Sequence, residues 1–140
     1  MYGVASTQAI GGLADADLDA PLGEGLSPQA RAAIDALPET SALLVVLRGP
    51  NAGSRFLLDA DATTAGRSTK SDIFLDDVTV SRRHATFERS GAGFEVRDLG
   101  SLNGTYVNRE RVDEAVLGAG DEVQIGKYRL TFHPSPAREQ

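Results

Sequence analysis

Two short segments combine arginine with glycine or serine in a way that suits phosphate binding. Arg67 follows Gly66, and glycine permits a close approach of the backbone or a positive φ where the arginine leaves a strand end. Ser81 and Arg82 stand directly before a predicted strand, with His84 two positions further on. Guanidinium groups can bond two phosphate oxygens, hydroxyl groups donate to others, and each charge-assisted bond contributes about 1.5–3 kcal/mol. These residues therefore predict an anion site built on two loops.

A third segment adds a tight turn and polar side chains. In Ser101-Leu102-Asn103-Gly104, the Asn-Gly pair readily adopts the left-handed geometry of a hairpin turn. The same residues offer a hydroxyl and an amide at the turn. We expect this segment to serve both the turn and the binding site.

The elements that must position these loops are short β-strands. Apolar and polar residues alternate with period two, as in Phe94 and Val96 or Leu130 and Phe132, which predicts a buried face on each strand. Many such strands between turns predict an all-β sandwich, whose connecting loops carry the site. The predicted strands span residues 42–47, 55–58, 73–75, 85–88, 94–98, 105–107, 122–125 and 128–132.

The first 40 residues differ from the rest in composition. They are rich in Ala, Gly, Asp and Pro and contain one aromatic residue, so they offer little apolar surface to offset the cost of ordering. We expect residues 1–40 to be a mostly disordered, regulatory tail with a marginal helix over 28–37 that begins at the N-cap Ser27. The folded domain is predicted to span residues 41–134, and residues 135–140 a disordered C-terminal tail.

Charge and residue types exclude several functions. Residues 1–40 hold six carboxylates and one arginine, and therefore five of the six net negative charges, which leaves a nearly neutral domain without the basic stripe that nucleic acid binding needs. Two histidines without cysteine are a poor metal inventory, and His133 is expected to be exposed. We predict no metal, no cofactor and no catalytic residue. The lack of a signal peptide or an apolar span predicts a cytoplasmic protein that is not bound to a membrane.

The three motifs, in this order and spacing, resemble the forkhead-associated (FHA) domain over residues 42–133. That resemblance implies a β-sandwich of about eleven strands that binds phosphothreonine peptides through apical loops. It implies phosphate contacts from Arg67, Ser81 and Arg82, with Ser101 in place of the threonine that often precedes Asn103 in the family. It further implies that Asn103 holds the peptide backbone. The implied structural support comes from Gly66, His84, Gly104 and Asn108.

Longer stretches, including residues 48–59, 71–85 and 100–109, resemble a group of small actinobacterial FHA regulators. The resemblance implies control by a Ser/Thr protein kinase and regulation of 2-oxoglutarate and glutamate metabolism. The implied partners are phosphothreonine proteins, the 2-oxoglutarate dehydrogenase E1 component and glutamate dehydrogenase. In that group a phosphorylated tail occupies its own domain, and the threonines available here are Thr7 and Thr40.

Two alternatives to phosphate-dependent binding deserve comparison. One is a constitutive module that binds unphosphorylated partner proteins through the same face. The other is a hydrolase with Ser81 as nucleophile and His84 as base, which the sequence disfavours because it has no Gly-x-Ser-x-Gly elbow and no orienting third group. We predict that the chain is not an enzyme.

Overall fold

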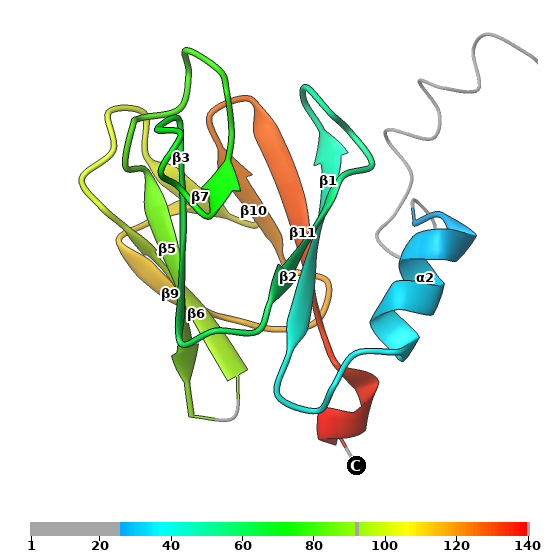
Figure 1. Cartoon of the computed structure of the whole chain (residues 1–140). Helices are drawn as coiled ribbons and strands as arrows, with labels where there is room; N and C mark the ends of the chain where they lie inside the picture. The colour runs from blue at the N-terminus through cyan, green and yellow to red at the C-terminus, as the bar shows by residue number, and fades with distance from the viewer. Residues whose placement is uncertain (1–25, 92, 140) are drawn as a thin grey trace, which may run out of the picture.

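The computed structural model describes residues 26–91 and 93–139. The expected disorder of residues 1–25, and Thr7 with it, lies outside the described residues. The described chain contains eleven strands, one α-helix and a final 3-10 helix (Figure 1), which confirms the predicted all-β fold. The elements are α2 (Pro28–Asp35), β1 (Ala42–Arg48), β2 (Arg55–Leu58), β3 (Ala62–Gly66), β4 (Ile73–Phe74), β5 (Ala85–Ser90), β6 (Gly93–Asp98), β7 (Thr105–Val107), β8 (Glu110–Val112), β9 (Glu114–Leu117), β10 (Glu122–Ile125), β11 (Tyr128–Pro134) and η1 (Pro136–Glu139).

The strands form two sheets that face each other. One sheet has the order β2-β1-β11-β10-β7-β8, and the other has the order β4-β3-β5-β6-β9. All neighbouring pairs are antiparallel except β3 with β4, which is parallel. The β5–β6 hairpin runs between the two ends of the sandwich. Ala85 pairs with Asp98 at one end, and Ser90 pairs with Gly93 at the other.

The core between the sheets is closed by aromatic and aliphatic side chains from both. Phe87 and Phe94 from one sheet and Leu130 and Phe132 from the other are at most 1% exposed. The rings of Phe94 and Phe132 meet edge to face, with centroids 6.0 Å apart. The period-two alternation therefore identified true core positions.

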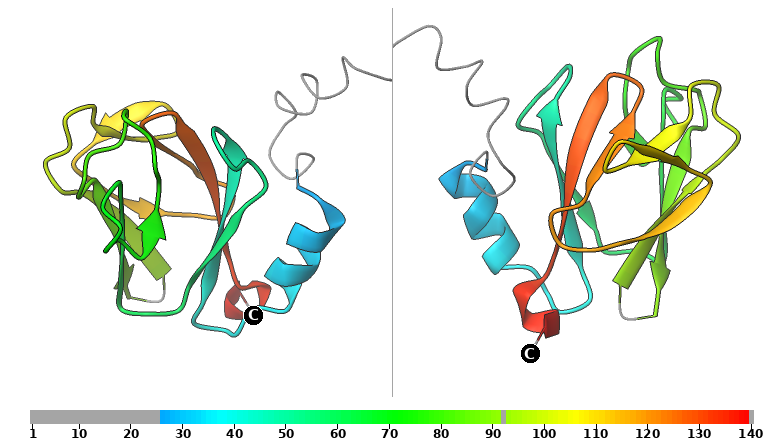
Figure 2. Two further views of the ribbon diagram at one scale, coloured as in Figure 1. Left: turned by 45° about the horizontal axis from the view of Figure 1, so that its top comes forward. Right: turned by 180° about the vertical axis from the view of Figure 1, so that it is seen from behind.

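β1 is buried on both faces because helix α2 covers the outside of its sheet (Figures 1 and 2). Leu44 and its alternate neighbours point into the sandwich core, whereas Leu43 and Val45 pack against Leu37 and Ala30 of the helical segment. Ser27 caps the helix by accepting a hydrogen bond from the Ala30 amide at 3.0 Å. The helix ends at Asp35, two residues before the predicted end, and its docking supplies the stability that eight residues lack alone.

The two ends of the described chain are tied together through Ser135. The fully buried Ser135 hydroxyl donates to the Leu37 carbonyl at 2.8 Å, and the Ser135 amide donates to the Ser41 carbonyl at 3.1 Å. The helix expected within 28–37 is present as a docked element, and a 3-10 helix over Pro136–Glu139 stands where a disordered tail was expected. A helix and a buried serine extend the folded part beyond residues 41–134 on both sides.

Candidate functional site

The three candidate loops meet at one end of the sandwich, the end where β3 and β6 finish and β5 begins (Figure 1). The β3–β4 and β4–β5 loops are joined by a hydrogen bond from the Arg67 amide to the Ser81 carbonyl, 2.9 Å long. The β6–β7 loop joins them through the Leu102 amide, which donates to the Ser81 hydroxyl oxygen at 3.0 Å. Ser81 is therefore the residue where all three loops connect. The structure brings the three loop motifs together from separate parts of the sequence.

Gly66 lets two of these loops approach each other closely. A β-carbon at this position would lie 2.1 Å from the Arg82 carbonyl oxygen and 3.0 Å from the Ser71 hydroxyl oxygen. Contacts under 3.0 Å force something to move, and here the nearest atoms belong to the backbone. Of the two reasons considered for a glycine, the structure shows close approach.

Two arginines project from this meeting point. Arg67 and Arg82 are both exposed, and neither forms an ion pair among residues 26–91 and 93–139. The Arg67 Nε donates to the Val80 carbonyl at 3.0 Å, which orients the guanidinium and leaves its terminal nitrogens available. Because the Ser81 oxygen already accepts the Leu102 amide, the Ser81 hydroxyl hydrogen remains available to an anion. These three groups form a set of donors without a neutralising carboxylate.

His84 braces the loops from inside the protein. Its side chain is fully buried, Nδ1 accepts the Ser81 amide at 3.1 Å, and Nε2 lies 2.9 Å from the Gly104 carbonyl oxygen. Both bonds form at once only in the neutral tautomer that carries its hydrogen on Nε2. Burial lowers the pKa of His84 and outweighs the opposing effects of the Gly104 carbonyl and the Asp98 charge. The imidazole is therefore neutral and fully used.

This arrangement removes the basis of the hydrolase alternative. His84 contacts the amide of Ser81 and not its hydroxyl, and its other nitrogen is taken by Gly104. A general base needs a free nitrogen within reach of the nucleophile's proton. Ser81 therefore has no such base in His84.

The structure corrects the role of Ser101. Its hydroxyl donates to the Asp98 Oδ1 at 2.5 Å and accepts the Gly104 amide at 3.0 Å, and the side chain is buried. A hydroxyl whose hydrogen is already donated inward cannot also donate it to a phosphate. Ser101 therefore supports the loop from inside, through its bonds to Asp98 and Gly104.

Asp98 is the supporting residue that sequence reasoning missed. Its carboxylate accepts hydrogen bonds from the Gly100 amide, from the Ser101 amide and hydroxyl, and from the Thr105 hydroxyl. Burial raises the pKa of Asp98, but these hydrogen bonds lower it more, so the net pKa lies below its usual 3.8. The pattern Asp-x-Gly-Ser, typical of a side chain that bonds the amides two and three residues ahead, was the available signal.

Asn103 and Gly104 form the turn of the β6–β7 loop. The Asn103 side chain donates from Nδ2 to the Thr79 carbonyl at 2.9 Å, and the residue is otherwise exposed at the rim. Gly104 has a φ of +88°, the left-handed conformation expected of the turn. Thr79 is itself held by Asp77, which accepts both its amide and its hydroxyl hydrogen. The turn therefore has the left-handed geometry expected of Asn-Gly, and the role of Asn103 toward a peptide stays a prediction.

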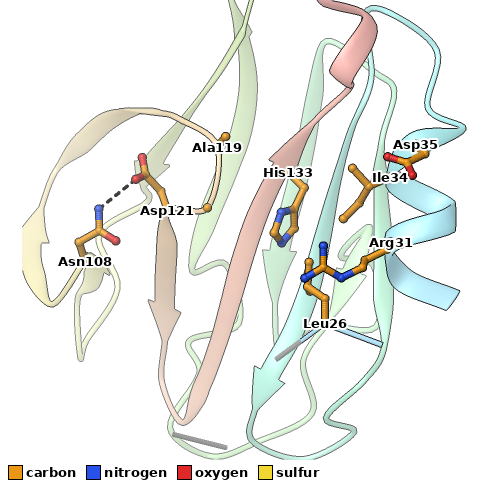
Figure 3. Close-up of a pocket in the computed structure, with 9 residues that line it drawn as sticks. Leu26, Arg31, Ile34, Asp35, Asn108, Ala119, Asp121 and His133 are labelled. Carbon is orange, nitrogen blue, oxygen red and sulfur yellow. Dashed lines mark hydrogen bonds between the residues drawn. The ribbon is translucent and has the colours of Figure 1, made fainter. Parts of the chain in front are cut away.

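Asn108 lies apart from this cluster. With Arg109 it forms the positive-φ turn between β7 and β8, and its amide nitrogen donates to the Asp121 Oδ1 at 3.1 Å. Figure 3 shows this pair on one side of a hollow that Arg31 and His133 border on the other. Asn108 supports the β9–β10 connection and not the anion donors.

The prediction that His133 is exposed is wrong. Its side chain is 9% exposed, and its Nε2 lies 2.8 Å from the Thr131 hydroxyl oxygen.

Comparisons with known proteins agree with this geometry. The FHA domain model matches residues 63–126. The glycogen accumulation regulator GarA of Mycolicibacterium smegmatis is 65% identical over 120 residues, which cover 86% of this chain and 75% of that protein. The chain belongs to the FHA domain family.

Further relatives show which kinds of FHA protein this chain is similar to. An oxoglutarate dehydrogenase inhibitor of Corynebacterium jeikeium is 69% identical over 101 residues, covering 72% of this chain and 70% of that protein. A solved FHA structure from a study of phosphothreonine-dependent FHA domain interactions matches with a TM-score of 0.64 and 31% identity, over 69% of this chain and 99% of that one. EmbR of Mycobacterium tuberculosis, in complex with a low-affinity phosphopeptide, matches with a TM-score of 0.64 and 31% identity, over 79% of this chain and 27% of that one. The chain thus carries a phosphothreonine-binding FHA domain and belongs with non-catalytic regulators.

The described residues offer neither a metal cluster nor a membrane-spanning helix. Within them, no group of three His, Cys, Asp or Glu side chains is arranged to hold a metal ion. No helix in the same ranges is long and apolar enough to cross a membrane.

Proposed function

We propose that this chain is a kinase-controlled regulator of 2-oxoglutarate and glutamate metabolism that recognises its partners through Arg67, Ser81, Arg82 and Asn103. The observation that carries the site is the set of donors from Arg67, Ser81 and Arg82, which form no ion pair among the described residues and lie on two loops that the β6–β7 loop fastens. A phosphothreonine dianion satisfies these donors, whereas an unmodified threonine leaves them without an anionic partner. Asn103 stands beside them to bond the peptide backbone.

The metabolic role is supported by the relatives. Proteins that share 69% and 65% identity with this chain are named oxoglutarate dehydrogenase inhibitor and glycogen accumulation regulator. We infer that the E1 component of 2-oxoglutarate dehydrogenase is a partner, that glutamate dehydrogenase is a second one, and that a Ser/Thr protein kinase controls both interactions. Phosphorylation of Thr7 or Thr40 would supply a ligand for the domain itself and so compete with these enzymes.

A fluorescent phosphothreonine peptide tests the site directly. Arg67→Ala and Ser81→Ala should each weaken binding by roughly 10- to 150-fold, the loss of one charge-assisted hydrogen bond of about 1.5–3 kcal/mol. Arg55→Ala is the matched control, because Arg55 is an exposed arginine on edge strand β2, across the sheet from β7 and β8. Anisotropy titrations in which the two site variants bind like the control would rule out the assigned residues.

The regulatory proposal has its own assay. Purified 2-oxoglutarate dehydrogenase complex should lose activity when the intact chain is added and recover it when the chain is first treated with the kinase. Arg67→Ala should inhibit much less. An enzyme that keeps full activity at saturating concentrations of the intact chain would refute the metabolic role while leaving peptide binding untouched.

A constitutive interaction module is the second candidate, and two exposed apolar residues favour it. Val78 and Leu102 are 88% and 85% exposed on the β4–β5 and β6–β7 loops, which also carry Ser81 and Asn103. Apolar side chains in this position can contact a partner that carries no phosphate. Equal affinity for phosphorylated and unphosphorylated partner would decide for this alternative.

A further inference from the structure

A groove next to the phosphate-binding loops is lined by residues of those loops and of β7, β10, β11 and the turns that follow β7 and β10. It has a volume of about 480 Å³. It is lined by Thr79, Asn103, Tyr106, Arg109, Gln124, Gly126, Lys127 and Arg129. Thr79 and Asn103 belong to the loops already described, and they are joined by the 2.9 Å hydrogen bond between the Asn103 amide and the Thr79 carbonyl. A peptide whose backbone is held at Asn103 therefore enters this groove with its neighbouring residues.

The groove is positively charged in a domain that is not. Three of its eight lining residues are cations, and none is a carboxylate. Among residues 26–91 and 93–139, Arg109 and Lys127 form no ion pair, while the Arg129 Nε lies 3.8 Å from the Glu122 Oε2. The hydrogen bonds from the Thr79 hydroxyl and amide lower the pKa of Asp77 most, and Asp77 is near enough to Lys127 for that charge to lower it further. The cations outnumber the carboxylates at the edge of the groove.

The turns that carry two of the cations are fixed by backbone geometry. Arg109 follows Asn108 in a turn in which both residues have positive φ, 72° and 50°. Lys127 follows Gly126, whose φ is +58° and whose added β-carbon would lie 2.4 Å from the Thr79 hydroxyl oxygen. The Lys127 amide donates to that same oxygen at 2.9 Å. The β10–β11 turn is therefore fastened to the β4–β5 loop, and the cations start from a rigid base.

We propose that this groove is a second anion subsite, which binds the carboxylates of aspartate or glutamate residues next to the phosphothreonine of a partner. The inference rests on the proposed phosphothreonine site and adds a preference for acidic sequence around it. Arg109 and Lys127 are the residues that determine this preference, because they are the unpaired cations of the groove. The phosphate donors hold the modified residue, and the groove selects among modified proteins.

The subsite is tested by measuring how tightly the intact chain binds short phosphothreonine peptides. One series carries aspartate at successive positions on either side of the phosphothreonine, and a matched series carries asparagine at the same positions. We expect aspartate on one side to tighten binding about 3- to 10-fold, as two partly exposed ion pairs permit, with a smaller effect at high salt. In the double variant Arg109→Gln, Lys127→Gln the preference should fall below about 2-fold, while the asparagine peptides keep their affinity. Arg55→Gln, an exposed cation on the opposite edge of the sheet, should keep the preference.

Each result separates the subsite from the phosphate site. Two results overturn the subsite: affinities that do not distinguish aspartate from asparagine on either side, or a double variant that keeps the preference. They do so even when phosphopeptides bind and Arg67→Ala weakens that binding. A double variant that weakens both peptide series equally also overturns it, because the cations would then act only through general attraction. Failure of every phosphopeptide to bind overturns the phosphate site, and the subsite with it.

Discussion

Gly66 is the residue at which the addition of a single methyl group should weaken phosphopeptide binding. In Gly66→Ala the new β-carbon meets the Arg82 carbonyl 2.1 Å away, so the β3–β4 and β4–β5 loops must separate. We expect phosphopeptide affinity to fall by at least about 10-fold, because displaced donors no longer share one anion. Gly118→Ala is the control, since its β-carbon would come no closer than 3.6 Å to another group. Peptide titrations of both variants give the measurement, and equal affinities would contradict the steric argument.

The buried histidines should make stability depend on pH in one direction. Burial lowers the pKa of His84 below its usual 6.5, and burial followed by the Arg31 charge lowers that of His133. Between the lowered pKa and 6.5 the unfolded chain binds more protons than the folded chain, so the free energy of unfolding falls as the pH drops. The carboxylates Asp77 and Asp98, whose pKa values lie below 3.8, add their loss only at lower pH.

Urea unfolding between about pH 7.5 and pH 5 measures this effect. Stability should stay level above about pH 6.5 and decrease below it. In His133→Gln the free energy of unfolding should change less steeply with pH, because only the contribution of His84 remains. A chain as stable at the lower pH as at the higher one would contradict the neutral, buried state of the imidazoles.

Single residues also mark where sequence reasoning reached its limit. Arg67, Ser81 and Arg82 could be proposed from the sequence because their chemistry is unusual and their motifs are spaced in order. Ser101 was misassigned because its type suits phosphate as well as it suits Asp98, and only the direction of its hydroxyl distinguishes the two. Asn108 was assigned to the wrong region because a motif gives order along the chain and not position in space.

At the scale of elements, helix α2 and the residues that follow it should stabilise the fold without taking part in binding. Leu37, 9% exposed, packs on Leu43 and Val45 of β1, on the outer face of the sheet. Leu37→Ala should lower the free energy of unfolding by about 2–4 kcal/mol, and the folded variant should keep its phosphopeptide affinity. Leu57→Ala is the control, because Leu57 is 48% exposed and should cost much less. Chemical denaturation and peptide titration of the two variants test both halves, and lost affinity in folded Leu37→Ala would contradict the separation.

Elements were predictable where alternation is strong and missed where strands are short and polar. The runs around Phe87, Phe94 and Leu130 gave β5, β6 and β11 because one face is buried. The strands β8 and β9 lie at the outer edges of the two sheets and are mostly exposed, so no apolar period marks them. The docking of α2 could not be predicted. Its partner is the second apolar face of β1, but the sequence of β1 is one continuous apolar run that does not show which element covers each face.

At the scale of the molecule, the two candidate phosphothreonines differ in what they can reach. The Thr40 carbonyl accepts a hydrogen bond from Arg89, which lies near the Ser90–Gly93 end of the β5–β6 hairpin. The phosphate loops lie at the Ala85–Asp98 end, roughly 17 Å away along β5 at about 3.3 Å per residue. Thr40 therefore faces away from its own site. The residues between Thr7 and Leu26 could span roughly 60 Å when extended, which is ample.

Kinase treatment should therefore give two distinguishable products. We expect a chain phosphorylated only at Thr7, in a Thr40→Ala background, to occupy its own site and remain monomeric at all concentrations. A chain phosphorylated only at Thr40, in a Thr7→Ala background, should join other copies in a concentration-dependent way. Sedimentation velocity with Arg67→Ala as control measures this, and a Thr40-phosphorylated chain that blocks its own site at high dilution would refute the placement.

The fastening of the described ends by Ser135 also determines how the fold should respond to force. β1 begins and β11 finishes at the same end, where Ala42 pairs with Pro134, and the ladder runs from there to Arg48 and Arg129. Tension applied between those two points loads the hydrogen bonds of this pair one after another and not all together. The domain should therefore open like a zipper under low force, starting at the end farthest from the phosphate-binding loops.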